Sequence, residues 1–241
     1  MSALKTDEVR ALLSDLGSDD WRERQSAARS LGLHAADLDE TLAGLLASED
    51  AGERNAAMKA LIRRGSQAIP VLAAHLQDPD ADVRNLSAVA LGQIGSAEAV
   101  GPLLEALDTE RDANVRYMIA EALGRIGDPV ATRRLLDLLD DEPWCAAAAI
   151  ESLGLIRDRS AVGRLAQLLS DEMVGGVAAT ALGRIADARS VLPLAHAAAA
   201  GDLASLSALA ELVGRWGKRA EALARALRTH LDAQERKALG E

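Results

Sequence analysis

The chain repeats one short sequence pattern along almost its whole length, at steps of 29 to 32 residues. A fixed period in this range is typical of stacked arrays, in which each unit buries its apolar face against its neighbours. The sequence therefore predicts an elongated repeat protein. The clearest copies read AVALGQIGS (88–96), AEALGRIGD (120–128), IESLGLIRD (150–158) and ATALGRIAD (179–187). The central residues of the seven copies are Leu31, Leu61, Leu91, Leu123, Leu153, Leu182 and Val213.

Each repeat divides into two helical stretches, as residues 81–108 illustrate. The first stretch has apolar residues at helical spacing and is followed by Gly95, a residue type that often ends helices. The second stretch has Pro102 near its start, where a missing N–H costs little, and leucines along one face. Aromatic residues are only 2% of the chain, so the core is expected to consist mainly of leucine and alanine, both strong helix formers.

A glycine follows the central residue in most copies, as in Gly92, Gly124, Gly154 and Gly183. Glycine inside a helix is destabilising relative to alanine, so its recurrence indicates that the partner helix passes close to this position. The predicted fold is all-α, a right-handed α-solenoid (α/α superhelix) of about seven two-helix repeats with an N-terminal capping helix. We interpret 1–241 as one domain, with the cap at 1–18, the repeats at 19–231 and a tail at 232–241.

The repeat resembles the short HEAT-like repeat of bacteria and archaea, the type also seen in phycobilisome lyase subunits. Asp82-Val83-Arg84 and Asn114-Val115-Arg116 match its start, and the segment 122–128 (ALGRIGD) matches its end. The resemblance implies an armadillo-like scaffold for protein binding. It also implies a ladder of arginines along the stack, each seven residues before a central residue. The ladder is expected at Arg24, Arg54, Arg84 and Arg116, and it stops at Ala146, Gly175 and Leu206.

Where the ladder stops, the first helices of two repeats begin with small and apolar residues, EPWCAAAA (142–149) and EMVGGVAA (172–179). Two interpretations remain open. In the first, small residues allow tight helix packing and the larger side chains fill the gaps. In the second, an apolar patch takes a partner helix or another copy of the protein, because exposed apolar area often marks an interface. The residues of this patch would be Tyr117, Trp144, Cys145 and Met173.

Composition argues against several function classes. The net charge of −10 disfavours nucleic-acid binding, which needs basic side chains to neutralise phosphates. No apolar run approaches the roughly 18 residues of a membrane span, and the first residues do not read as a signal peptide, so a soluble, cytoplasmic protein is expected. With Cys145 as the single cysteine, an internal disulfide is excluded.

No pattern of reactive residues predicts an enzyme. The four histidines lie in different repeats, without the spacing of a metal site, and no phosphate-binding glycine loop occurs. Cys145 has no basic neighbour in the sequence and is expected to be inert. We therefore predict no catalytic residue, no cofactor and no metal. The histidines are His34, His75, His196 and His230.

The predicted function is a non-enzymatic scaffold or adaptor that binds a protein partner. The second helices of such a stack usually line its concave face, and their outward side chains are the candidate contacts. The alternatives are a subunit of a bilin-lyase-like enzyme or a small-ligand binder, followed by a nucleic-acid-binding HEAT protein. The candidate partner-binding residues are Glu98, Glu105, Arg133, Arg134, Asp137, Arg164 and Gln167.

Overall fold

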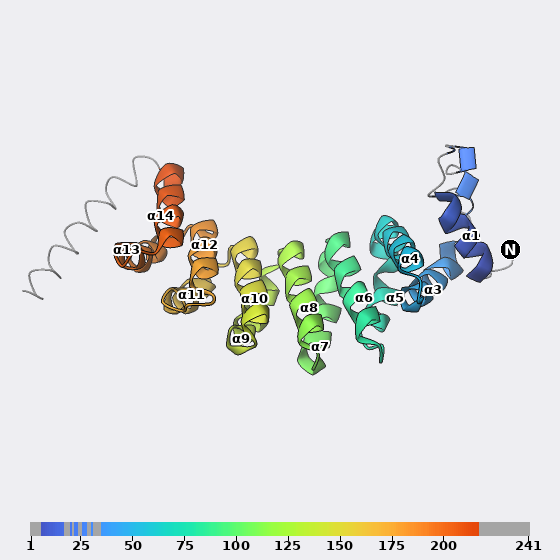
Figure 1. Ribbon diagram of the computed structural model, residues 1–241, viewed down its shortest axis with the longest axis horizontal. Helices are drawn as coiled ribbons and strands as arrows, with labels where there is room; N and C mark the ends of the chain where they lie inside the picture. The colour runs from blue at the N-terminus through green and yellow to red at the C-terminus, as the bar shows by residue number, and fades with distance from the viewer. Residues whose placement is uncertain are drawn as a thin grey trace, which may run out of the picture. The chain divides into compact units, whose positions relative to one another are not determined.

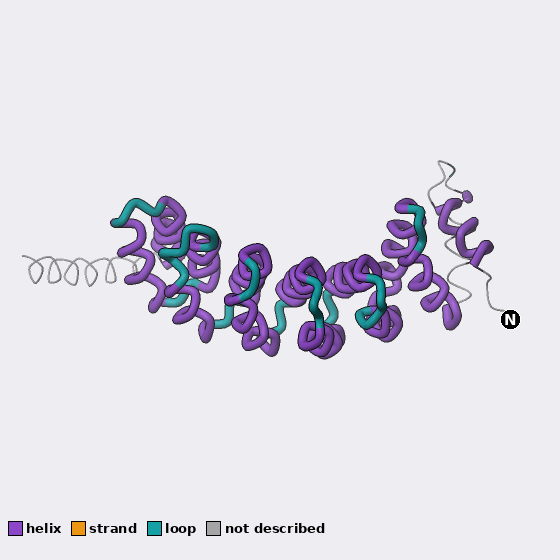
Figure 2. Tube along the Cα trace, turned by 60° about the horizontal axis from the view of Figure 1, so that its bottom comes forward, coloured by secondary structure: helices purple, strands orange, loops and turns teal. Residues whose placement is uncertain are grey.

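The computed structural model of the chain describes residues 6–16, 20, 22, 23, 26, 27, 30 and 35–216. These residues form helices joined by short loops, and none of them lies in a strand (Figure 2). The chain divides into two compact units, Met1–Ala131 and Thr132–Glu241, which are described separately. Figure 1 labels the helices of each unit.

In unit 1, helices that begin the repeats alternate with helices that end them. The first helices are stacked, with α6 packing on α4 and α8, and each second helix packs against the first helix that follows it. The helices are α1 (Thr6–Leu16), α3 (Ala35–Gly44), α4 (Ala51–Arg64), α5 (Ile69–His75), α6 (Ala81–Ile94), α7 (Val100–Thr109) and α8 (Ala113–Ile126). The 3₁₀ turns are η1 (Leu45–Ala47), η2 (Gly65–Ala68), η3 (Ala97–Ala99) and η4 (Pro129–Ala131).

Unit 2 repeats the same arrangement, with α12 stacked between α10 and α14 and with α13 packed on α14. The alternation of first and second helices within each unit confirms the predicted α-solenoid. The helices are α9 (Thr132–Asp137), α10 (Pro143–Ile156), α11 (Val162–Gln167), α12 (Gly175–Ile185), α13 (Val191–Ala199) and α14 (Leu203–Trp216). The 3₁₀ turns are η5 (Leu138–Asp140), η6 (Arg159–Ala161) and η7 (Ala188–Ser190).

Local sequence signals set the helix ends. Asp50, Asp80 and Asp112 stand just before α4, α6 and α8, and each side chain accepts a hydrogen bond from an N–H of the first turn. Gly95 and Gly127 end α6 and α8 in the left-handed conformation, as glycine readily does. The helix expected at 4–17 is observed as α1.

The core consists of leucines and alanines at equivalent positions of successive repeats. The central residues Leu61, Leu91, Leu123, Leu153 and Leu182 are fully buried. Val213, their counterpart in the seventh repeat, is 53% exposed. Residues 219–231, which the sequence assigns to the second helix of that repeat, lie outside the described residues, as do Leu31 and Arg24.

The recurring glycines lie at close helix contacts. A Cβ atom at Gly92 would be 2.7 Å from the Cα of Ala122, and at Gly154 3.0 Å from the Cα of Ala181. The close neighbour is thus the first helix of the next repeat, rather than the second helix of the same repeat. It comes near because the first helices stack directly on one another and carry alanine at the point of contact.

The arginine ladder is present in the described part of unit 1. Arg54 donates to the carbonyl oxygens of Ser48 and Glu49, and Arg116 donates to that of Arg111. These arginines satisfy carbonyl groups of the loop before their own helix. The ladder therefore holds the inter-repeat loops in place, a structural role.

Arg84 occupies the same ladder position and makes more contacts. Its Nη1 donates to the carbonyl oxygens of Asp78 and Pro79, at 2.7 and 3.1 Å. Its Nε and Nη2 donate to the two carboxylate oxygens of Glu110, at 2.7 and 3.1 Å. Burial raises the pKa of Glu110, but the hydrogen bonds from Arg84 and from nearby backbone N–H groups outweigh it, and the pKa lies below its ordinary value.

Candidate partner-binding surface

Five of the predicted contact residues lie on two successive second helices of unit 2. Arg133, Arg134 and Asp137 belong to α9, and Arg164 and Gln167 belong to α11. Arg164 joins the two repeats, since its Nη2 is 2.5 Å from the carboxylate of Asp140 in η5. We call these five residues together with Asp140 the charged strip.

The ion pairs of the charged strip are exposed to solvent. Arg134 pairs with Asp137 at 3.3 Å, and Arg164 also donates to the side-chain oxygen of Gln167 at 3.2 Å. Exposed pairs of this kind contribute only about 0–1 kcal/mol to stability. The side chains can therefore exchange these partners for those of a bound protein at little cost.

The other two predicted contact residues lie in unit 1. Glu98 is in η3 and Glu105 is in α7, and both are exposed. The structure brings neither of them into the charged strip, which is described within unit 2 alone.

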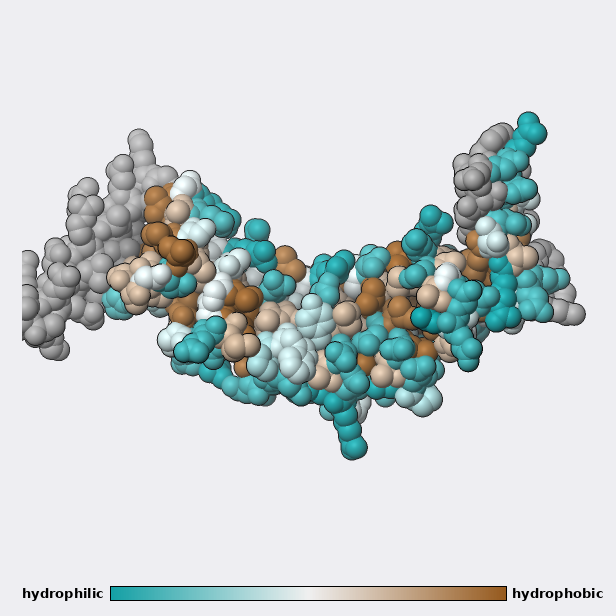
Figure 3. Space-filling view, in the orientation of Figure 1, coloured by the Kyte–Doolittle hydropathy of each residue, from teal (hydrophilic) through white to brown (hydrophobic). Residues whose placement is uncertain are grey.

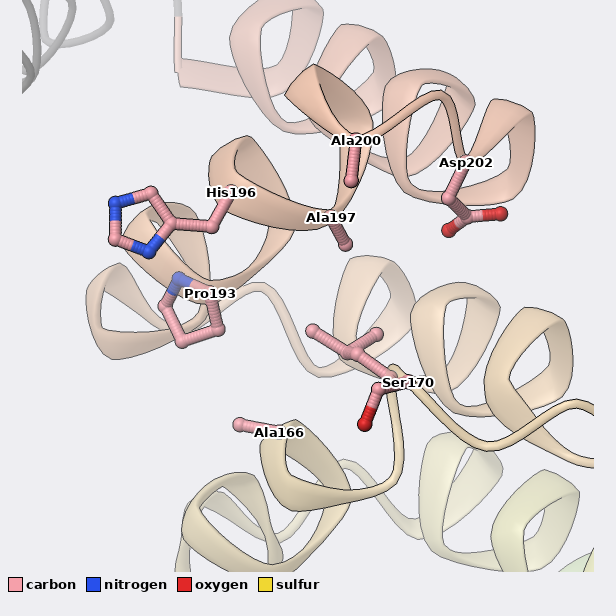
Figure 4. A pocket seen from close by; sticks show the side chains of 8 residues that line it. Ala166, Ser170, Pro193, His196, Ala197, Ala200 and Asp202 are labelled. Atoms are coloured by element: carbon pink, nitrogen blue, oxygen red, sulfur yellow. The ribbon is translucent and has the colours of Figure 1, made fainter.

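A pocket between α11 and α13 adjoins the charged strip, and the sequence did not predict it. Its volume is about 380 Å³. In Figure 4, Ala166 and Ser170 face Ala197 and Ala200 across the opening, and the ring of His196 lies over Pro193 at the rim. Leu169 and Asp202 complete the lining. Because Ala166 and Gln167 are neighbours on α11, the pocket and the charged strip share one helix.

Two residue changes in the repeat explain this pocket. Glu110, thirteen residues before the central Leu123, corresponds to Ala200, thirteen residues before Val213. The ladder residue Arg84 corresponds likewise to Gly175. The space beside Arg84 in unit 1 therefore contains an ion pair, whereas its counterpart in unit 2 is lined by small side chains. Aligning the repeats at these two positions would have revealed the difference.

The predicted apolar patch is only partly at the surface. Trp144 and Met173 are 51% and 72% exposed, whereas Cys145 is fully buried. Its inclusion in a surface patch was therefore wrong. Cys145 stands eight residues before Leu153, where Val115 precedes Leu123, and that position points into the core. Tyr117 is half-buried and belongs to unit 1.

Apolar side chains are also exposed on the last described helix. Leu203, Leu206 and Val213 of α14 are each more than half exposed, and Figure 3 shows apolar residues gathered over this helix. Their spacing places them along one side of α14.

Trp144→Ala is expected to lower the free energy of unfolding by about 1 kcal/mol or less, because half of the side chain already contacts water. Truncation of a buried tryptophan typically costs about 3–5 kcal/mol. Urea denaturation measures this difference, with the fully buried Leu165→Ala as the destabilised control. A loss near 3 kcal/mol for Trp144→Ala would show that the ring belongs to the core. Light scattering of the same variant tests whether Trp144 takes part in self-association.

Metal-ligating side chains meet at the start of α10. The donor atoms of Asp141, Glu142 and Cys145 lie within 4.8 Å of one another. Asp141 also accepts the N–H of Glu142 at 2.7 Å. We assign no metal here, because two carboxylates and one thiol combine ligands preferred by different metal ions.

The histidines lie apart in the described part of the chain. His75 contacts the carbonyl oxygen of Val71 in its own helix at 2.9 Å, and His196 is at the rim of the pocket. His34 and His230 lie outside the described residues. Among the described residues, no helix combines the length and the hydropathy needed to cross a membrane.

Comparison with known proteins identifies the repeat. The family model described as HEAT repeats matches residues 9–92 and 69–145, which together are more than half of the chain. No protein of curated function matches the sequence.

Three solved structures are similar to this chain. The complex of CpcE and CpcF of phycocyanin lyase from Nostoc sp. PCC7120 shares 22% identity, with 95% of this chain and 96% of that chain covered and a TM-score of 0.46. Human deoxyhypusine hydroxylase in complex with glycerol shares 18% identity over 83% and 99% of the two chains, with a TM-score of 0.41. An engineered protein shares 23% over 94% and 97%, also at 0.41. Together with the stacked helix pairs of each unit, the matched family model shows that the chain belongs to the HEAT-repeat family.

Proposed function

We propose that the protein is a non-enzymatic scaffold that binds a segment of a partner protein along the second helices of unit 2. HEAT repeats make the chain a repeat scaffold. The observation that supports this binding surface is the charged strip, which crosses from one repeat to the next and continues into a pocket.

The two parts of the surface suit different parts of a partner. Arg133 and Arg134 would contact acidic side chains, while Asp137 and Asp140 would contact basic ones, so a mixed-charge segment is held in one register. The adjoining pocket, lined mainly by alanine, leucine and proline, would take an aliphatic side chain. The charged strip consists of ion-paired side chains and an amide without a nucleophile, so we propose no reaction for it.

Charge reversal at Arg133 and Arg134 together is expected to weaken partner binding at least tenfold without changing stability, because both side chains are on the surface of α9. The measurement is affinity capture of the tagged protein from its native cell extract, followed by titration of the captured partner. Lys59→Glu with Arg63→Glu is the matched control, since it makes the same change in net charge on the exposed side of α4. A partner held equally well by both variants would exclude the charged strip.

A further inference from the structure

Arginines gather at one edge of unit 2, in the turns between the first and second helices of two successive repeats. Arg159 and Arg189 are 76% and 62% exposed, and Arg157 is also exposed. Arg184, in the last turn of α12, is half-buried. We call Arg157, Arg159, Arg184 and Arg189 the turn-edge cluster. It is separate from the charged strip, which is formed by second helices.

Contacts across the two repeats hold the cluster together. Arg159 and Arg189 approach the carboxylate of Asp187 from two sides, at 3.7 and 2.9 Å. Arg189 also donates to the carbonyl oxygen of Arg159 at 2.8 Å. The side chain of Arg184 lies against the last turn of α10, since its Cδ is 3.6 Å from the place of a Cβ on Gly154. The four guanidinium groups therefore belong to one region of the surface.

The cluster is locally cationic. Its aspartates, Asp158 and Asp187, accept the N–H groups that begin η6 and η7. The backbone N–H of Ser160 lowers the pKa of Asp158, and the hydrogen bond from the Arg189 side chain lowers that of Asp187, so both are ionised at neutral pH. Four arginines still exceed two aspartates. Because salt screens charges beyond about 8 Å, this local excess counts more for a bound ligand than the net charge of −10.

Arg157 occupies a backbone conformation that arginine rarely adopts. It ends α10 with φ of 60°, in the left-handed region, where α4, α6 and α8 are followed by Gly65, Gly95 and Gly127. A side chain in this region strains the backbone, and such strain is concentrated at functional sites. Ala186 has the same conformation at the end of α12 without adding a charge, so it provides a matched comparison.

We propose that the turn-edge cluster binds an acidic segment of a partner protein. Guanidinium groups bind carboxylates through paired, charge-assisted hydrogen bonds, and the exposed faces of Arg157, Arg159 and Arg189 offer such donors. A nucleic acid fits less well, because the cluster has no aromatic side chain on which a base could stack. This second surface is independent of the partner site on the second helices.

The test measures binding of a fluorescein-labelled decaglutamate peptide by anisotropy, at low and at physiological salt. Arg157→Gly is expected to weaken binding about two- to fivefold, the range for one exposed ion pair, and to raise the Tm by about 2–4 °C through release of strain. Ala186→Gly is expected to raise the Tm similarly and to leave binding unchanged. Combining Arg157→Gly with Arg159→Gln should weaken binding further, and the peptide should dissociate at higher salt.

Three outcomes would overturn the proposal. The first is equal peptide affinity in the wild type and the double variant. The second is tighter, Arg157-dependent binding of a uridine 20-mer, which would assign the cluster to RNA. The third is a salt-sensitive dimer in light scattering that Arg157→Gly abolishes, which would assign it to a second copy of the chain. Charge reversal at Arg133 and Arg134 should leave peptide binding intact, so this result is separable from the function proposed above.

Discussion

Arg84→Ala is expected to lower the free energy of unfolding by about 3–5 kcal/mol, the range for removal of one partner from a buried ion pair. The variant leaves the Glu110 carboxylate, only 5% exposed, without its cation. It also removes the donor to the carbonyl oxygens of Asp78 and Pro79. Urea denaturation at neutral pH measures the loss.

Two further variants separate the ion pair from general effects of truncation. Arg134→Ala, which breaks an exposed pair, should cost less than about 1 kcal/mol. Arg84→Met with Glu110→Leu should recover part of the loss, because no unpaired charge then remains. The interpretation of a buried pair is wrong if Arg84→Ala behaves like Arg134→Ala.

The same pair makes stability depend on pH. Because the pKa of Glu110 is lowered in the folded protein, its contribution is fully present above the pKa of glutamate in the unfolded chain, about 4.3. The contribution is lost as the pH falls through the lower pKa of the folded state. The difference in stability between the wild type and the Arg84→Met, Glu110→Leu variant should therefore narrow below about pH 4.

Gly92→Ala is expected to destabilise the protein by about 1–3 kcal/mol, the usual cost of overpacking a core. The added methyl group would be 2.7 Å from the Cα of Ala122, so the backbone of α8 would have to move. This cost opposes the preference of helices for alanine over glycine, worth up to about 1 kcal/mol. Thermal and urea denaturation measure the net effect.

Gly101→Ala serves as the comparison for Gly92→Ala. No atom lies within 4 Å of the place of its Cβ, and the residue is in α7. It should stabilise the protein by about 0.4–1 kcal/mol, because alanine restricts the unfolded chain. A stabilising effect at both glycines would show that α6 and α8 are not in close contact at Gly92.

Much of the fold could be predicted because the repeat has a fixed period. Leucines at 30-residue steps identified the first helices, and Gly95 and Gly127 identified their ends. The start of α10 could not be resolved in the same way. Its residues Trp144, Cys145 and Ala146 are all apolar or small, so no alternation of polar and apolar residues shows which side faces water.

The candidate surface was predictable in part. Arg133, Arg134 and Asp137 are charged residues of one predicted second helix, so their exposure follows from its pattern. The pocket beside them depends on what is missing, since Ala200 stands where another repeat has Glu110. A search for reactive or charged residues cannot find such a site.

The glycine contacts also bear on how the length of the chain can change. The same junction, a glycine of one first helix against an alanine of the next, occurs between Gly92 and Ala122, between Gly154 and Ala181, and between Gly183 and Ala208. Duplication or deletion of one whole repeat, as unequal recombination of a gene produces, would join matching surfaces. Insertion of a single residue in a first helix would instead rotate the glycine away from its alanine. The length of this scaffold can therefore evolve in whole repeats.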